Sequence, residues 1–309
     1  MIKTLLKSVR QYKKQTLLSP VFVAGEVILE CMIPLVMSKL IDHLSAETMT
    51  PILKYGLILL VMATISLGFG VLAARNAAEA SCGFAKNLRQ DMYFKIQDFA
   101  FADIDKFSAS SLVTRMTTDI TNVQMAYMMS IRLLARAPIM IILSWVMTLA
   151  LNKTVAMLFL IVIPLLGGTL IFIAKKAHPH FIKVFDEYDV LNNSVQENVN
   201  ASRVVKAFVR EDYEIDKFHI ISKYVYSLFT KAEKIVAWNS PVMQFTMYVV
   251  ILVIVAIGGN SIVTGTMQTG ELTSIIVYSL QILMSLMMVT FVFVMIMIAE
   301  ASTDRIAEV

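Results

Sequence analysis

The sequence predicts an all-α membrane protein with six transmembrane helices that extend into the cytosol. Composition is the first reason: of 309 residues, 57% are hydrophobic and only 16% are charged, whereas soluble domains have about 25% charged residues. Six apolar stretches, each long enough to cross a bilayer, are the second reason. The third is a pair of long charged stretches between them, from about Arg75 to Arg136 and from about Lys175 to Lys234.

The six spans are found by length, because a helix needs about 20 mainly apolar residues to cross the hydrocarbon core. They are predicted at about 17–41, 52–74, 131–151, 155–174, 235–263 and 272–299. Short connections join the spans in pairs and define one side of the membrane. The other side holds both termini and two long loops, at about 75–130 and 175–234.

The distribution of Lys and Arg predicts the orientation. Of the 27 Lys and Arg residues, 24 lie on the side that holds the termini and the long loops. Cytoplasmic segments carry such an excess of positive charge. We therefore expect a multi-pass protein of the cell (plasma) membrane with both termini cytoplasmic.

The N-terminal segment, residues 1–16, alternates apolar side chains with Lys and Arg. This pattern predicts a short amphipathic helix on the inner leaflet, with its cations near anionic lipid. A plain basic flank that only enforces the topology explains the pattern equally well. The apolar stretch that follows has about 25 residues, too long for the core of a cleaved signal peptide, which has about 7–15.

The two long charged stretches are predicted to be helical. Residues 79–101 contain no proline and one glycine, and residues 181–234 contain neither. Spans two to five therefore continue past the membrane as helices. About 20 additional residues would extend each helix by roughly 30 Å into the cytosol. Small residues at 107–111 favour a turn at the first tip, and the stretch 198–202 weakens the helix near the second. A short helix at each tip could lie across the ends of the long ones.

Two sequence motifs lie at these tips. Residues 107–119 read Phe-Ser-Ala-Ser-Ser-Leu-Val-Thr-Arg-Met-Thr-Thr-Asp, and residues 203–214 read Arg-Val-Val-Lys-Ala-Phe-Val-Arg-Glu-Asp-Tyr-Glu. Both resemble the coupling-helix motifs in the transmembrane domain of type I ABC exporters, the family of multidrug and lipid export pumps. Ser110 departs from the family, which usually has glycine there. The resemblance covers the whole chain and implies the ABC transporter type 1 transmembrane fold over 17–304, with 305–309 starting a linker.

The resemblance also implies where force enters the membrane domain. It places coupling helices at about 108–114 and 208–214, docked on nucleotide-binding domains. The residues implied in this contact are Ser108, Leu112, Val113, Arg115 and Asp119 at the first tip and Phe208, Arg210 and Glu211 at the second. Without the resemblance, Phe208 is better explained by packing between the long helices, and the charges by a solvated face.

The motor that drives such a domain is absent from the sequence. None of the 11 glycines begins a phosphate-binding G-x-x-x-x-G-K-[S/T] loop, and there is no Leu-Ser-Gly-Gly signature. The chain is therefore not predicted to be an enzyme by itself. ATP and Mg²⁺ are implied for a missing nucleotide-binding domain, and the end at Val309 favours a fragment cut before that domain over a separate polypeptide. Expected partners are that domain, a second transmembrane half (identical or homologous) and the lipid bilayer, with no nucleic acid.

Charged residues inside a span are functional candidates. Glu26 and Glu30 lie four apart, on one face of the first span, where they could face a central cavity and attract cationic substrates. Alternatively, Glu26 is hydrated near the inner interface, or both pair with a cation such as Arg132 or Arg136. Further cavity candidates are Met284, Met288 and Met295, because methionine suits adaptable apolar pockets, although lipid-facing or generic packing is favoured for them.

Three functions are compatible with this sequence. The leading hypothesis is the membrane half of an ATP-driven exporter that alternates between inward- and outward-open states. An ion-gradient-driven secondary transporter is the main alternative, but such proteins usually have short loops and helices broken at the midplane. The third is a membrane scaffold that transports nothing and binds partners through its loops.

Overall fold

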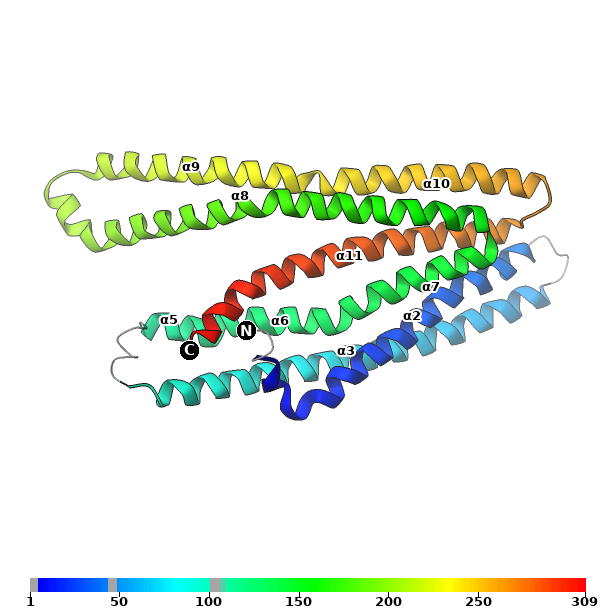
Figure 1. The fold of residues 1–309 in the computed structure, drawn as a ribbon, viewed down its shortest axis with the longest axis horizontal. Helices are drawn as coiled ribbons and strands as arrows, with labels where there is room; N and C mark the ends of the chain where they lie inside the picture. Colours follow the sequence, from blue (N-terminus) through cyan, green and yellow to red (C-terminus); the bar gives the residue numbers. More distant parts are fainter. Residues whose placement is uncertain (1–4, 44–48, 101–106, 108) are drawn as a thin grey trace. The chain divides into compact units, whose positions relative to one another are not determined.

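The computed structural model describes residues 5–43, 49–100, 107 and 109–309, and every element in this part of the chain is helical. The elements are η1 (Leu6–Tyr12), α2 (Lys13–Asp42), α3 (Thr50–Gln97), α5 (Ala109–Thr114), η2 (Arg115–Asp119), α6 (Ile120–Met129), η3 (Ser130–Leu134), α7 (Ala135–Leu151), α8 (Lys153–Ala207), α9 (Glu211–Ala237), α10 (Asn239–Val263) and α11 (Thr269–Ala307). Within the described residues, six helical stretches are long and apolar enough to cross a membrane. The all-α membrane fold is therefore confirmed (Figure 1).

The chain divides into two compact units. Unit 1 comprises Met1–Phe159 and Val250–Val309, and unit 2 comprises Leu160–Val249. Unit 1 contains α2, α3, α7 and α11, whereas unit 2 contains α9 and most of α8. Both borders fall inside helices, α8 and α10, so two continuous helices connect the units.

The middle of unit 1 is an apolar core between α2, α3, α7 and α11. The buried positions of α2, among them Val23, Val27 and Cys31, recur every four residues and so form one face of the helix. They pack against Ala73 of α3 and Tyr278 of α11. The opposite face of α3 leaves its leucines exposed, as a helix that borders lipid would. Figure 1 shows α2 crossing α3, which continues well beyond the N-terminal end of α2.

The N-terminal segment packs on α3 instead of facing outward. Leu5 and Val9 are buried against Phe84 and its neighbours. A side chain at Gly83 would place its Cβ 2.3 Å from the ring of Tyr12, so only glycine permits this approach. The sequence predicted either an amphipathic helix on the leaflet or a basic flank, and neither prediction included this contact with protein.

One nearly continuous helix runs from residue 109 to residue 151, with two π-helical segments in it, η2 and η3. Among the described residues of the first tip, α5 continues into η2 and α6, so residues 109–129 form no separate short helix across the ends of the long ones. The π-helical geometry of η3 has a local physical cause. Pro138 has no N–H to donate to the carbonyl of Leu134, which removes one α-helical hydrogen bond where the wider turn ends.

Unit 2 contains an antiparallel helix pair, α8 and α9 (Figure 1). Phe229 of α9 lies edge-on to Phe181 and Tyr188 of α8, with ring centroids 6.4 and 5.8 Å apart. The predicted weakening at 198–202 is wrong, since α8 continues through these residues to Ala207. Asn198 is instead held by a hydrogen bond to Glu214, at 3.0 Å.

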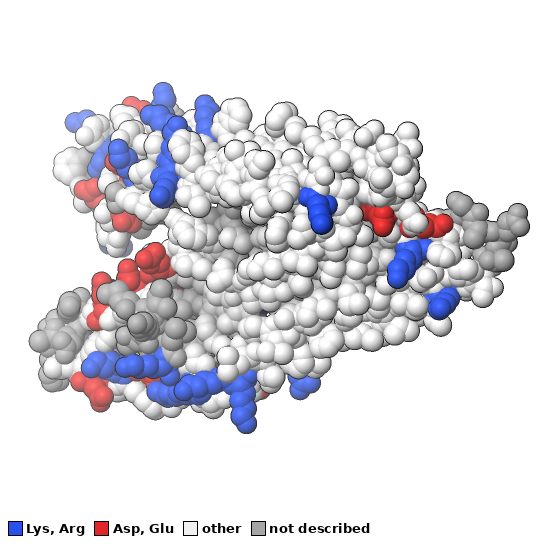
Figure 2. All heavy atoms as spheres, turned by 45° about the vertical axis from the view of Figure 1, so that its right-hand side comes forward, with Lys and Arg blue, Asp and Glu red and all other residues white. Residues whose placement is uncertain are grey.

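Figure 2 shows a larger group of charged side chains on the left, a smaller group on the right and an almost uncharged stretch between them. In unit 1 the charge-rich end of the helices contains Asp91, Asp119 and Arg305. The opposite end has the short connections, of which the one between α7 and α8 is Asn152 alone. Its side chain accepts a hydrogen bond from the backbone N–H of Val155 at 3.1 Å and so starts α8.

Candidate functional site

Three ionisable side chains form a cluster within the apolar part of unit 1. Arg136 of α7 donates to Glu26 Oε1 at 2.8 Å and to Glu30 at 2.5 and 2.6 Å. The two carboxylates lie one helical turn apart on α2, so one planar guanidinium reaches both. This is the pairing with Arg136 that the sequence left as one alternative. Intramembrane charges are expected to pair in this way, because an unpaired ion in an apolar medium is costly.

The neighbouring cation, Arg132, lies on η3. Among the described residues its side chain has no hydrogen-bond or ion-pair partner. The two arginines are four residues apart, but only Arg136 enters the cluster with the two glutamates. The carboxylate of Glu26 is also incompletely satisfied, since its Oε2 atom is buried without a hydrogen-bond partner in the described structure.

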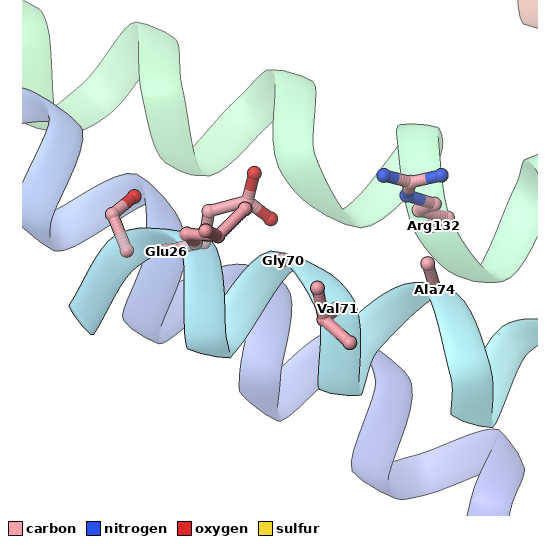
Figure 3. Close-up of a pocket in the computed structure, with 7 residues that line it drawn as sticks. Glu26, Gly70, Val71, Ala74 and Arg132 are labelled. Carbon is pink, nitrogen blue, oxygen red and sulfur yellow. The ribbon is translucent and has the colours of Figure 1, made fainter. Parts of the chain in front are cut away.

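A cavity of about 360 Å³ lies beside this cluster. Its lining comes from three elements: Glu26 of α2, Arg132 of η3 and a stretch of α3 that includes Gly70 and Val71. Figure 3 shows the Glu26 carboxylate close to Gly70 and the Arg132 guanidinium farther along α3, close to Ala74. Gly70 makes room for the carboxylate, because a Cβ at this position would lie 3.3 Å from Glu26 Oε1.

A line of polar contacts that sequence reasoning missed joins α2, α7 and α11. Ser144 of α7 donates to Gln281 Oε1 at 3.0 Å, and its hydroxyl lies 3.7 Å from the thiol of Cys31. Tyr278 donates its hydroxyl to the carbonyl of Cys31 at 2.6 Å. Single uncharged polar residues on apolar helices give no periodic signal, so only the packing of three helices identifies them as one network.

The methionines of α11 do not join this site. Met284 is 66% exposed, whereas Met288 and Met295 are half-buried. None of the three lines the cavity beside Glu26. Their predicted part in a substrate pocket stays a prediction.

At the charge-rich end of unit 1, Asp119 is buried and links η2 to the last turns of α11. Arg305 donates to both of its carboxylate oxygens, through Nε at 2.9 Å and through a second guanidinium nitrogen. Ser302 donates to the same carboxylate at 3.0 Å. Sequence spacing could not indicate this pairing, since 186 residues separate Asp119 from Arg305.

Arg115, on the same π-helical segment, also turns toward the end of α11. It donates to the backbone carbonyl of Arg305 and to Glu308 Oε2 at 2.8 Å. Its guanidinium lies 4.8 Å above the ring of Phe107, a favourable cation–π contact. Arg115 and Asp119 thus face α11, whereas the resemblance implied that they contact a nucleotide-binding domain.

Two other residues implied at the first tip lie near the surface: Val113 is exposed, and Leu112 is half-buried. Ser108 lies outside the described residues. The structure therefore brings together Arg115 and Asp119 and leaves Val113 facing outward.

The second tip, in unit 2, is a tight turn. Phe208, Val209 and Arg210 connect α8 to α9, and Glu211 is the first residue of α9. Phe208 is 74% exposed and Val209 is 80% exposed, so the tip presents two apolar side chains with Arg210 and Glu211 exposed beside them. Val209 adopts φ 50°, a left-handed conformation that is strained for a β-branched residue. The interpretation that Phe208 packs between the long helices is wrong for this structure.

Residues 16–286 match the family described as ABC transporter transmembrane region. An uncharacterised ABC transporter ATP-binding protein of Bacillus subtilis (strain 168) is 32% identical over 285 residues, which are 92% of this chain and 50% of that protein. A second such protein, of Mycobacterium tuberculosis (strain ATCC 25618 / H37Rv), is 26% identical over 310 residues, 100% of this chain and 53% of its own. An ATP-dependent lipid A-core flippase of Desulfotalea psychrophila is 27% identical over 186 residues, 57% of this chain and 32% of the flippase. The chain thus spans about half the length of the first two relatives.

Proposed function

Because the chain belongs to the family of ABC transporter transmembrane regions, we propose that it forms one half of the translocation pathway of an ATP-driven exporter. In this role it couples ATP hydrolysis by nucleotide-binding domains to alternating access across the cell membrane. The family match over residues 16–286 carries the proposal. The relatives support it too, since two of them are named as ATP-binding proteins and a third as an ATP-dependent flippase.

The motor would lie outside the 309 residues. ATP and Mg²⁺ are bound by the nucleotide-binding domains in this proposal, and a second transmembrane half completes the pathway. Both termini and both tips then lie in the cytoplasm. The 24 Lys and Arg on that side support this orientation.

The second tip is the proposed contact with the motor. Phe208 is the apolar anchor, and Arg210 and Glu211 form a charged rim around it. Two exposed apolar side chains at the end of a helix pair are a liability unless a partner covers them, which supports a docking role. At the first tip, Val113 and Leu112 are proposed to take the corresponding place. Ser108, which the resemblance also implies in this contact, lies outside the described residues.

Arg115 and Asp119 have a different part in this proposal. They transmit movement of the first tip to α11, because their hydrogen bonds end on Arg305 and Glu308. The helix that carries them continues to Arg136, in the membrane cluster. A push at the tip can therefore reach both the end of α11 and the glutamates of α2 through one helix.

Transport by the full-length protein in proteoliposomes tests the function. ATP-dependent flux, abolished when the nucleotide-binding domain cannot hydrolyse ATP, is the expected result. Flux driven by a proton or sodium gradient without ATP would favour a secondary transporter, and no flux of any tested amphiphile would favour a scaffold. Neither alternative is supported by a specific observation.

The same assay tests the substrate candidates. If Glu30 attracts cations, Glu30→Gln changes the flux of cationic substrates and leaves neutral ones unchanged. The ion pair with Arg136 weakens this expectation, since much of the negative charge is already neutralised. Equal effects on both substrate classes would remove the idea, and replacement of Met284, Met288 or Met295 is the matched comparison on α11.

A further inference from the structure

The cavity beside the membrane ion cluster has a positive end, a guanidinium without a side-chain partner among the described residues, and a negative end, a carboxylate with one oxygen unsatisfied there. At one end is the guanidinium of Arg132, which has no partner there. At the other is Glu26 Oε2, which is buried without a hydrogen bond. Arg136 does not satisfy this atom, because it donates to the other oxygen of Glu26 and to Glu30. A buried polar atom without a partner is rare and calls for a ligand or an ordered water.

The charges of this region balance. The charges of the two glutamates and two arginines sum to zero. A free cation would be attracted by Glu26 and repelled by Arg132. A free anion would be attracted by Arg132 and repelled by Glu26. A ligand that carries both charges satisfies both ends. The guanidinium suits a phosphate, to which it can donate two parallel hydrogen bonds. The carboxylate oxygen needs an N–H donor.

The walls between the two ends are apolar and open outward. Leu67 and Val71 of α3 line the cavity and are exposed. The cavity therefore opens on the exposed apolar face of α3. The apolar residues along the same face of α3 continue beyond the cavity, where acyl chains would lie. The volume of about 360 Å³ suits a headgroup, being at the lower end of the range for small-molecule sites, roughly 300–1,000 Å³.

We propose that this cavity binds the headgroup of a zwitterionic phospholipid with a primary ammonium group, of the phosphatidylethanolamine class. Arg132 holds the phosphate, and Glu26 Oε2 accepts a hydrogen bond from the ammonium. A choline headgroup carries the same charges but has no N–H, so it satisfies Arg132 and leaves Glu26 without a donor. The site binds lipid in the absence of ATP, so the proposal does not depend on the proposed export function.

The test measures lipid binding to the full-length protein by native mass spectrometry. Phosphatidylethanolamine, phosphatidylcholine and phosphatidylglycerol with identical acyl chains are offered in competition, without nucleotide. We expect phosphatidylethanolamine to bind about tenfold more tightly than phosphatidylcholine, the size of one charge-assisted hydrogen bond. Equal binding of these two lipids would overturn the proposal.

Variants separate the two ends of the site. Glu26→Gln should remove the preference for ethanolamine over choline while both lipids still bind, and Arg132→Gln should weaken both about equally. Arg75→Gln is the control, since Arg75 is exposed on α3 next to Ala74 of the cavity wall and does not line the cavity. If Arg75→Gln lowers lipid affinity as much as Arg132→Gln does, any positive charge at this depth of the membrane attracts lipid. That result would contradict a specific site.

A variant without a charge change protects the test against misfolding. Val71→Trp narrows the cavity from an exposed position of α3 and changes neither the arginines nor the glutamates, so it should abolish the ethanolamine preference in a protein that unfolds at the wild-type temperature. Retention of the preference in this variant would place the lipid elsewhere. Soluble glycerophosphoethanolamine is a further arm: if it fills the site as well as the lipid does, the assignment to a membrane lipid is wrong.

Discussion

Asp119 and Arg305 form a two-point ion pair that ties the start of the third long helix to the last turn of α11. Asp119 is buried, whereas the side chain of Arg305 is about half exposed. The pair lies beside Ser302, which donates to the same carboxylate. Three donors thus hold one buried carboxylate at the charge-rich end of unit 1.

This pair should stabilise unit 1 measurably. Arg305→Ala leaves Asp119 buried with only Ser302, and we expect a loss of about 2 kcal/mol, less than the ~3–5 kcal/mol for breaking a fully buried pair because Arg305 is partly solvated. Thermal unfolding of the purified protein measures the loss. Asp304→Asn is the control, one residue away and exposed. A double-mutant cycle with Asp119→Asn should show coupling, and strict additivity would contradict a direct interaction.

Removing Arg136 should have a larger effect. Arg136→Gln leaves Glu26 and Glu30 close together without their cation, and we expect a loss of about 3–5 kcal/mol. The triple variant with Glu26→Gln and Glu30→Gln removes all three charges and should recover much of this stability. Thermal unfolding in detergent compares the two, and a triple variant less stable than Arg136→Gln alone would disprove the charge argument.

Gly270 should not tolerate a side chain. Its backbone N–H donates to Asp42 Oδ1 at 2.8 Å, and an added Cβ would lie 2.2 Å from the carbonyl oxygen of Ser38. Gly270→Ala is therefore expected to push α11 away from α2 and to cost about 1–3 kcal/mol. Gly259→Ala is the matched control, because a Cβ added at this position of α10 would have nothing within 4 Å, and it should leave the melting temperature unchanged or raise it slightly.

The turn at the second tip gives two coupled expectations. Val209→Gly should raise the free energy of unfolding of unit 2 by about 1 kcal/mol, measured by thermal unfolding, because glycine adopts positive φ without strain. Phe208→Cys, with a thiol-attached photoactivatable cross-linker, should capture a nucleotide-binding domain in the full-length protein, detected by mass spectrometry of the cross-linked peptides. Ile220→Cys is the control, since Ile220 is similarly exposed on α9 away from the turn, and it should not cross-link. Failure at Phe208 and at its neighbours in the turn would count against docking.

The fold class was predictable because it depends on local properties. Six apolar spans and helical patterns continuing beyond them were readable without tertiary information, and the described helices confirm them. The tips were less predictable. The helix continues through 198–202, where Asn198 also hydrogen-bonds Glu214 of α9, because local propensity is a weak signal that tertiary context often overrides.

The ion cluster shows where prediction from sequence stops. Spacing on α2 indicates that Glu26 and Glu30 share a face, but it does not select a partner. Arg132 and Arg136 are equivalent in sequence, both near the start of the third span. In the structure Arg132 lies on the π-helical segment and Arg136 on α7, and only Arg136 reaches the glutamates.

By itself, the sequence of this protein determined its helical class, its six apolar spans and the asymmetry of its positive charge, because these follow from residue type and period along one chain. The tertiary structure decided the partners: Arg136 for the glutamates, Arg305 for Asp119, and α3 for the N-terminal segment. The physical reason is that a charge or a polar atom in a low-dielectric interior must be paired, and its partner is chosen by which helices meet, often more than 100 residues apart in the sequence.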